Sequence, residues 1–242
     1  MSAAVMVALA SLCVGEAEAQ WSRSELQARG VKLPRRWGLG VTYYQQDQPY
    51  GVDSLVLGIP GFPPGVADDL DVQNHTETTH AELDYWLLPF LDVHVIIGQI
   101  EGTTDVALSE LNLGLPLGDI TARYDGLVYG AGFTLAGGGE RWFGSLTGQY
   151  TATDLDGGNS SVEAWVVSPR AGLVLGPTTA YVGAMYQRPE EKHSGIYEVP
   201  GLGTVPYEVT LGSTDEWNYL AGLTWSLTER FVLVVEGGFG VR

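Results

Sequence analysis

Apolar residues alternate with small or polar residues in many short segments of the chain. From Trp217 to Trp225, every second residue is Trp, Tyr, Ala or Leu, and the residues between them are mostly small or polar. The same split recurs over residues 37–44, 127–135 and 142–151. Successive side chains of a β-strand point to opposite faces, so this period predicts strands that each have one apolar face.

Segments of this kind predict nine strands, near residues 36–46, 78–89, 91–101, 123–136, 141–152, 161–175, 178–188, 215–226 and 229–240. Their connections alternate between short turns, such as Leu88-Pro89-Phe90, and long loops, such as residues 47–77. Short turns at one rim and long loops at the other are typical of outer-membrane barrels. The expected fold class is therefore all-β, an antiparallel transmembrane β-barrel with long extracellular hairpin-like loops.

Aromatic residues indicate which way the apolar face of each strand points. Trp217 and Trp225 are eight residues apart, about 26 Å along a strand, which strand tilt reduces to about 20 Å. This length is close to the apolar band of an outer-membrane barrel, about 25 Å. Because Trp and Tyr prefer the headgroup level, we expect an outward-facing aromatic girdle. Its members are Trp37, Tyr43, Trp142, Tyr150, Trp217, Tyr219 and Trp225.

The composition supports a membrane location and argues against a nucleic-acid partner. Charged residues make up 17% of the 242 residues, below the roughly 25% of soluble domains. The 29 acidic and 12 basic residues give a formal net charge of −17, which disfavours binding to a polyanion.

The N-terminal residues predict export. The apolar run Ala3–Val14 is too short to span a bilayer and is followed by Ala17-Glu18-Ala19, a small-x-small cleavage signature. We therefore expect a signal peptide at residues 1–19, which would carry away the single cysteine, Cys13. Residues 20–35 are rich in Arg and Lys and are expected to form a basic periplasmic arm.

These features together resemble a Gram-negative outer-membrane β-barrel protein over residues 36–240. The tract from Asp84 to Val93, DYWLLPFLDV, also resembles a strand–turn–strand unit of uncharacterised members of this class. The resemblance implies an outer-membrane location and contact with outer-membrane lipid and lipopolysaccharide. It implies no particular activity.

The C-terminus departs from the pattern of such barrels, which usually have an even number of strands and end on an aromatic residue. This sequence ends Gly238-Phe239-Gly240-Val241-Arg242. We therefore expect residues 36–242 to form the barrel with a tenth, final strand missing. The alternative is a nine-stranded barrel closed by parallel pairing of Trp37–Tyr43 with Phe231–Phe239.

The long loops carry apolar tips around Phe62, Leu115 and Leu202. Apolar patches at a surface usually mark contacts, so these tips are candidates for binding a hydrophobic ligand or partner at the barrel mouth. The first interpretation is nevertheless that the loops are strand extensions that only prolong the wall, and contact at the tips is the alternative.

Several charged residues are expected to face the lumen, where buried charges must pair. An ion-pair plug is the first interpretation, and a narrow polar path for a small solute is the alternative, because general pores belong to larger barrels. The residues of this expected polar network are His80, Glu82, Asp84, Asp92, His94, Arg170 and Glu236.

Catalytic and metal-binding signals are weak. Hydrolysis needs Ser or a carboxylate beside a His, and the residue types are present, but their spacing matches no nucleophile motif. The residues considered are His75, His80, His193, Ser194, Asp68 and Asp69. Asp154-Leu155-Asp156-Gly157-Gly158-Asn159 has a fragment of calcium-loop spacing without the terminal Glu, which favours a plain acidic turn.

The sequence therefore predicts a non-enzymatic outer-membrane barrel, without metal or cofactor, that acts as a surface scaffold or binding component. The first alternative is a narrow channel for small or hydrophobic solutes. The second alternative is an outer-membrane hydrolase.

Overall fold

The protein is an all-β antiparallel barrel, as expected. The computed structural model describes residues 3–10, 35–59, 70, 72–107, 119–155, 160–199 and 203–240. Among these residues, no helix is long and apolar enough to cross a membrane. The strands are β1 (Ala3–Ala10), β2 (Trp37–Leu57), β3 (Val72–Leu88), β4 (Leu91–Val106), β5 (Ile120–Gly138), β6 (Trp142–Leu155), β7 (Ser160–Leu175), β8 (Thr178–Val199), β9 (Gly203–Ser213), β10 (Trp217–Ser226) and β11 (Val232–Gly240).

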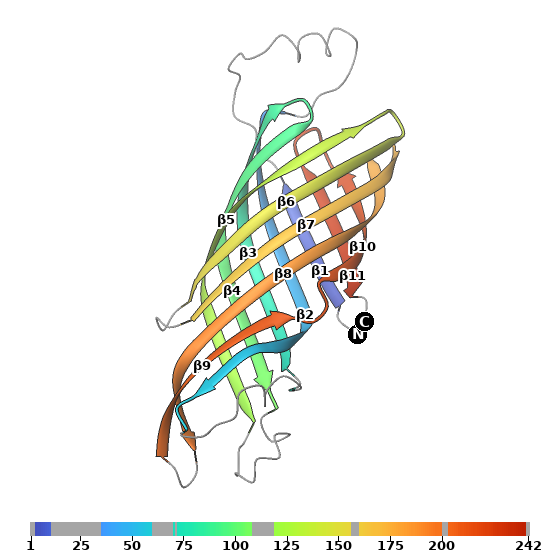
Figure 1. Cartoon of the computed structure of the whole chain (residues 1–242). Helices are drawn as coiled ribbons and strands as arrows, with labels where there is room; N and C mark the ends of the chain where they lie inside the picture. Colours follow the sequence, from blue (N-terminus) through green and yellow to red (C-terminus); the bar gives the residue numbers. More distant parts are fainter. Residues whose placement is uncertain are drawn as a thin grey trace.

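The described strands close into a ring at two levels (Figure 1). At one level the ring contains β1 to β8 with β10 and β11, and it closes where β1 pairs with both β11 and β2. At the long-loop end, β9 pairs with both β2 and β8, so β2 to β9 form a ring of eight strands. We call this eight-stranded ring, made of β9 and the adjoining ends of β2 to β8, the outer extension. Closure pairs the backbone polar groups of neighbouring strands and leaves no open sheet edge.

β1 occupies the place between β11 and β2. Ala3 pairs with Phe239 of β11, and Ala10 pairs with Gly40 of β2. Because β11 and β2 both run antiparallel to β1, they run in the same direction and are not paired directly, in contrast to the nine-stranded alternative. The sequence analysis expected a strand after Arg242 in this place. Cleavage of residues 1–19 remains a prediction, and residues 20–34 of the expected basic arm lie outside the described residues.

Each long strand changes its apolar face along its length, and β4 shows this most clearly. Near the short-turn rim, its outward residues Val95 and Ile97 are 54% and 57% exposed, while Asp92 and His94 point inward and are buried. From Gln99 onward the outward residues are polar, and the inward ones include Ile100 and Val106. The apolar face therefore changes from the outside to the inside between Ile97 and Gln99.

The same change occurs on β8, where outward Val182 is 65% exposed and the outward positions after Tyr186 are Arg188, Glu190 and Lys192. A protein wall with an apolar exterior is stable in lipid, whereas an apolar interior is stable in water. The ten-stranded part is thus the membrane-spanning part of an outer-membrane β-barrel, and the outer extension projects beyond the bilayer.

The interior of the outer extension has an apolar core, in contrast to the polar lumen of the membrane band. One cluster contains Tyr50, Val72 and Leu211, and Leu211 is 1% exposed. A second contains Ile100, Tyr124 and Leu155. Water around the outer extension reverses the orientation that the apolar face has in the membrane band.

Within the membrane band, charged side chains that face the lumen pair with one another. Arg170 donates through Nε and Nη2 to the two carboxylate oxygens of Glu236, at 2.8 and 3.0 Å. His94 Nδ1 lies 3.3 Å from Asp92 Oδ1. A Cβ atom at Gly132 would lie 2.4 Å from His94 Nε2, so this glycine makes room for the imidazole. The expected lumen residues His80, Glu82 and Asp84 are all half-buried on the inward face of β3.

We expect the Arg170→Ala substitution to lower the free energy of unfolding by about 3–5 kcal/mol, because it leaves the Glu236 carboxylate buried without its partner. The double substitution Arg170→Met with Glu236→Leu should recover most of this loss. Lys192→Ala removes the exposed pair with Glu190 and should leave the stability almost unchanged, because water screens this pair. Denaturant unfolding in lipid vesicles measures all three. Equal losses for Arg170→Ala and Lys192→Ala would contradict the assignment of the lumen pair.

Candidate functional site

The candidate site lies in the outer extension, where β8 presents Glu191 and His193 to the interior. Both are buried, whereas Lys192 between them and Ser194 after them are exposed. This alternation is the ordinary consequence of the strand period. In the register of β7 with β8, Ser160 pairs with His193, so the first residue of β7 stands beside the imidazole.

A chain of hydrogen bonds joins the three side chains. His193 Nδ1 lies 3.0 Å from Ser160 Oγ, and His193 Nε2 lies 3.1 Å from Glu191 Oε2. Because an ionised carboxylate only accepts hydrogen bonds, Nε2 carries the proton and Nδ1 presents its lone pair to the serine hydroxyl. This is the arrangement in which a histidine activates a serine nucleophile and a carboxylate holds the imidazole.

Glu191 is fully buried, and its carboxylate is satisfied by donors from the opposite wall. Oε1 accepts from Tyr124 Oη at 2.9 Å and from Asn74 Nδ2 at 3.1 Å. Oε2 accepts from Thr104 Oγ1 at 3.4 Å, in addition to His193. A buried carboxylate is tolerated only when such partners replace water. The network fixes Glu191, which in turn fixes His193.

The two tyrosines nearest to Glu191 are held in their neutral form. Burial, reinforced by the negative charge of Glu191, raises the pKa of Tyr124 and of Tyr50 above the ordinary value. Both phenols therefore keep their protons at neutral pH, and Tyr124 acts as a hydrogen-bond donor to the carboxylate.

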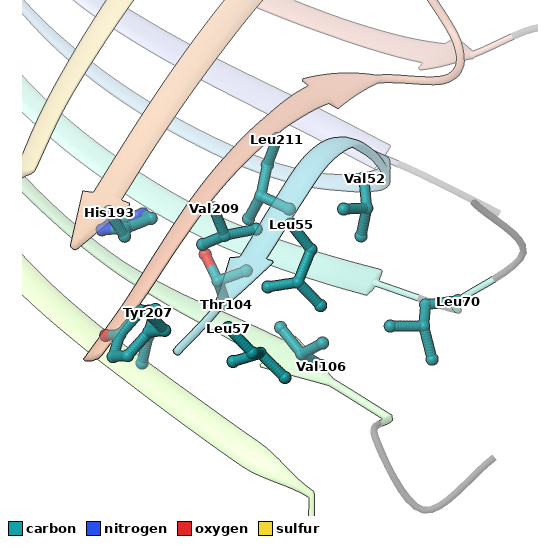
Figure 2. A pocket seen from close by; sticks show the side chains of 11 residues that line it. Val52, Leu55, Leu57, Leu70, Thr104, Val106, His193, Tyr207, Val209 and Leu211 are labelled. Carbon is teal, nitrogen blue, oxygen red and sulfur yellow. The ribbon is translucent and has the colours of Figure 1, made fainter. Parts of the chain in front are cut away.

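His193 also lines an apolar cavity (Figure 2). The cavity lies between β2 and β9 on one side and β4 and β5 on the other, and its lining is almost entirely aliphatic. The lining residues are Val52, Leu55, Leu57, Leu70, Thr104, Val106, Ala122, His193, Tyr207, Val209 and Leu211. An apolar cavity with a few polar groups at one end is the usual form of a small-molecule site.

The structure separates most of the residues that the sequence analysis considered for catalysis. His75 faces outward and contacts Asp47, with Nδ1 2.5 Å from Oδ1. His80 lies in the membrane band, and Ser194 is exposed on the face of β8 opposite to His193. Asp68 and Asp69 lie outside the described residues. Of the considered residues that the structure describes, only His193 is at the candidate site.

The expected aromatic girdle points outward. Trp142, Trp217, Tyr219 and Trp225 are all at least half exposed, at 50–58%, and Trp37, Tyr43 and Tyr150 share the outward faces of β2 and β6. The expected apolar loop tips around Phe62, Leu115 and Leu202 lie outside the described residues. So do residues 156–159 of the acidic turn, and no described group of His, Cys, Asp and Glu could hold a metal ion.

The sequence analysis missed Ser160 and Glu191. The spacing of Glu191 and His193 was a usable signal, because residues two apart on a strand share a face. Ser160 is 33 residues away from His193, and only the register of β7 with β8 brings the two together.

Comparisons with known proteins give no family. Neither the protein-family models nor the curated proteins include a match. Among solved structures, the chain is similar to LpxR from Salmonella typhimurium, with 10% identity, 98% of this chain and 99% of that chain covered, and a TM-score of 0.35. A chain described as "Asymmetric conductivity of engineered proteins" has 7% identity, 99% coverage of both chains and a TM-score of 0.11. Likenesses with such low TM-scores transfer neither activity nor site.

The expectation that the protein is not an enzyme is corrected. The expectation rested on the absence of a nucleophile spacing in the sequence, whereas the structure brings Ser160 and Glu191 each within hydrogen-bond distance of His193.

The pKa of His75 tests the contact between His75 and Asp47 on the outward face of the outer extension. The hydrogen bond to Asp47 raises the pKa of His75 above its usual 6.5. The protonated pair thus contributes stability below pH 6.5, and this contribution is lost as pH rises through the folded-state pKa. Both side chains are largely exposed, so the contribution is below about 1 kcal/mol. NMR titration should find that Asp47→Asn lowers the pKa of His75, and an unchanged pKa would contradict the contact.

Proposed function

We propose that the protein is an outer-membrane hydrolase that cleaves carboxylic esters at the outer extension. The observation that carries this proposal is the hydrogen-bond chain from Ser160 through His193 to Glu191 at the wall of an apolar cavity. Ser160 is the nucleophile, His193 is the general base and acid, and Glu191 is a positioning residue.

The order of the proposed steps follows from the tautomer of His193, in which Nε2 carries the proton and Nδ1 can accept one. His193 Nδ1 accepts the proton of Ser160 as Oγ attacks the ester carbonyl, and the same imidazole then donates that proton to the departing alcohol. The acyl group remains on Ser160 until water, deprotonated by His193, attacks it and releases the carboxylic acid. The proton held by His193 returns to Ser160 Oγ, and Glu191 stabilises the imidazolium formed in each half of the cycle.

The side chains inside the membrane band argue against the channel alternative, because they occupy the lumen through which a solute would have to pass. Arg170 and Glu236 form a bidentate pair across the lumen, and His94 fills the space beside Gly132. The exposed apolar exterior is in contact with outer-membrane lipid, and lipopolysaccharide is the proposed neighbour at the outer rim. Export to the outer membrane is part of this proposal.

A second candidate function is binding of an apolar ligand without chemistry. The aliphatic lining around Val209 and Leu211 favours this second function. The sequence analysis also named binding of a hydrophobic ligand at the barrel mouth as a candidate function. The two functions differ in their dependence on Ser160, because binding needs the cavity and hydrolysis also needs the hydroxyl.

We expect the refolded barrel to hydrolyse p-nitrophenyl esters and Ser160→Ala to lower kcat/KM by at least about a thousandfold. His193→Ala should have a comparable effect, because the serine then loses its base. A fluorophosphonate probe should label Ser160, as read by mass spectrometry.

Ser161→Ala is the matched control, because Ser161 is the next residue on β7 and makes no hydrogen bond to His193 in the described part of the chain. It should keep wild-type activity. Wild-type protein without esterase activity or probe labelling would refute the hydrolase, and retained apolar-ligand binding would then favour the second candidate.

A further inference from the structure

The cavity beside His193 and the polar network beneath it define how a substrate reaches the site. Resting on the proposed function, we infer that the substrate is an ester with a single apolar acyl chain, which enters as a dissolved molecule from the outer end of the barrel. Its chain lies in the cavity and its ester group at Ser160.

The first reason is the height of the site above the bilayer. On β8 the outward face is apolar up to Tyr186, and the next three outward residues are Arg188, Glu190 and Lys192. His193 is seven residues further along the strand than Tyr186, about 23 Å, or about 18 Å after tilt. A lipid whose chains stay in the membrane cannot bring an ester near its chains to this height.

The second reason is that the described outer wall next to the bilayer is polar or charged on β4 and β8. On β8 the outward residues Arg188, Glu190 and Lys192 are exposed, and on β4 the outward residues include Glu101 and Asp105. An acyl chain that climbed this surface would leave lipid for charged groups and water, which is unfavourable for each methylene exposed.

The third reason is that the lumen is closed below the cavity. Glu191 on β8 is bonded to Asn74 on β3, Thr104 on β4 and Tyr124 on β5, so hydrogen bonds cross the eight-stranded ring from wall to wall. We call these four residues the polar floor. An apolar chain could pass it only by separating a buried carboxylate from its donors.

Above the polar floor, the cavity has one polar end and an aliphatic body. His193 and Thr104 supply the polar groups, and Val106 and Ala122 are among the residues on the wall opposite β9. A molecule that matches this distribution has one reactive polar group and one apolar tail. Ala122 pairs with Thr104 in the register of β4 with β5, so a larger side chain at position 122 would take up space directly above the polar floor.

The test compares p-nitrophenyl esters with acyl chains from acetate to dodecanoate, each below its aggregation threshold. For the wild type, kcat/KM should rise at least about tenfold from acetate to the octanoate range, as successive methylenes are buried. Ala122→Phe should lose this rise, so that the longer esters are cleaved no more efficiently than acetate. The control Thr121→Phe places the same side chain at the exposed neighbouring position and should retain the rise.

A second arm distinguishes dissolved from membrane-bound substrates. The octanoate ester in solution should be cleaved at least about tenfold faster, per accessible molecule, than a diacyl phospholipid in vesicles that contain the barrel. Equal or faster cleavage of the vesicle lipid would overturn the inference, as would equal rates on all chain lengths by the wild type. Either result leaves the hydrolase intact, whereas absence of cleavage of every ester refutes the proposed function itself.

A binding measurement tests whether the acyl chain lies in the cavity, independently of ester hydrolysis. The Ser160→Ala protein should bind the fluorescent fatty acid cis-parinaric acid, and the additional Ala122→Phe substitution should weaken this binding at least about tenfold. Unchanged binding in a folded double variant, judged by its heat-dependent gel mobility, would overturn the placement of the chain in the cavity.

Discussion

The main physical constraint on this structure is that the same strands lie partly in lipid and partly in water. In lipid the apolar face of a strand must point outward, and in water it must point inward. β4 satisfies both requirements by exchanging the character of its two faces between Ile97 and Gln99. Because a strand presents successive residues to opposite sides, this exchange needs only a change in which alternate positions are apolar, with no interruption of the backbone pairing.

The two levels of closure follow from the same requirement. In the membrane, ten strands surround a lumen that is filled with paired charges such as Arg170 and Glu236. Beyond the membrane, β9 joins β2 directly to β8, so eight strands enclose a narrower interior that is filled with Val72, Leu211 and their neighbours. The narrower ring suits an aliphatic core, because fewer strands surround less space.

The polar floor combines a structural and a chemical role. A buried carboxylate in an aliphatic interior is stable only with its hydrogen bonds made, so Asn74, Thr104 and Tyr124 are needed before Glu191 can be there at all. Once fixed, Glu191 determines the tautomer and direction of His193. The same residues thereby close the lumen and orient the group that faces Ser160, which places the reactive end of the cavity at a defined height.

The sequence by itself determined nine of the eleven described strands, their outward aromatic residues and the alternation of short and long connections, because the two-residue period is a local property of the chain. It did not determine that Glu191 and His193 share a face, because the predicted strand 178–188 ended before both residues. It did not determine that Ser160 meets His193, that Asn74, Thr104 and Tyr124 converge on Glu191, or that Ala3–Ala10 lies between β11 and β2. These contacts depend on register and closure, which are set by the packing of the whole ring, and so only the tertiary structure decided them.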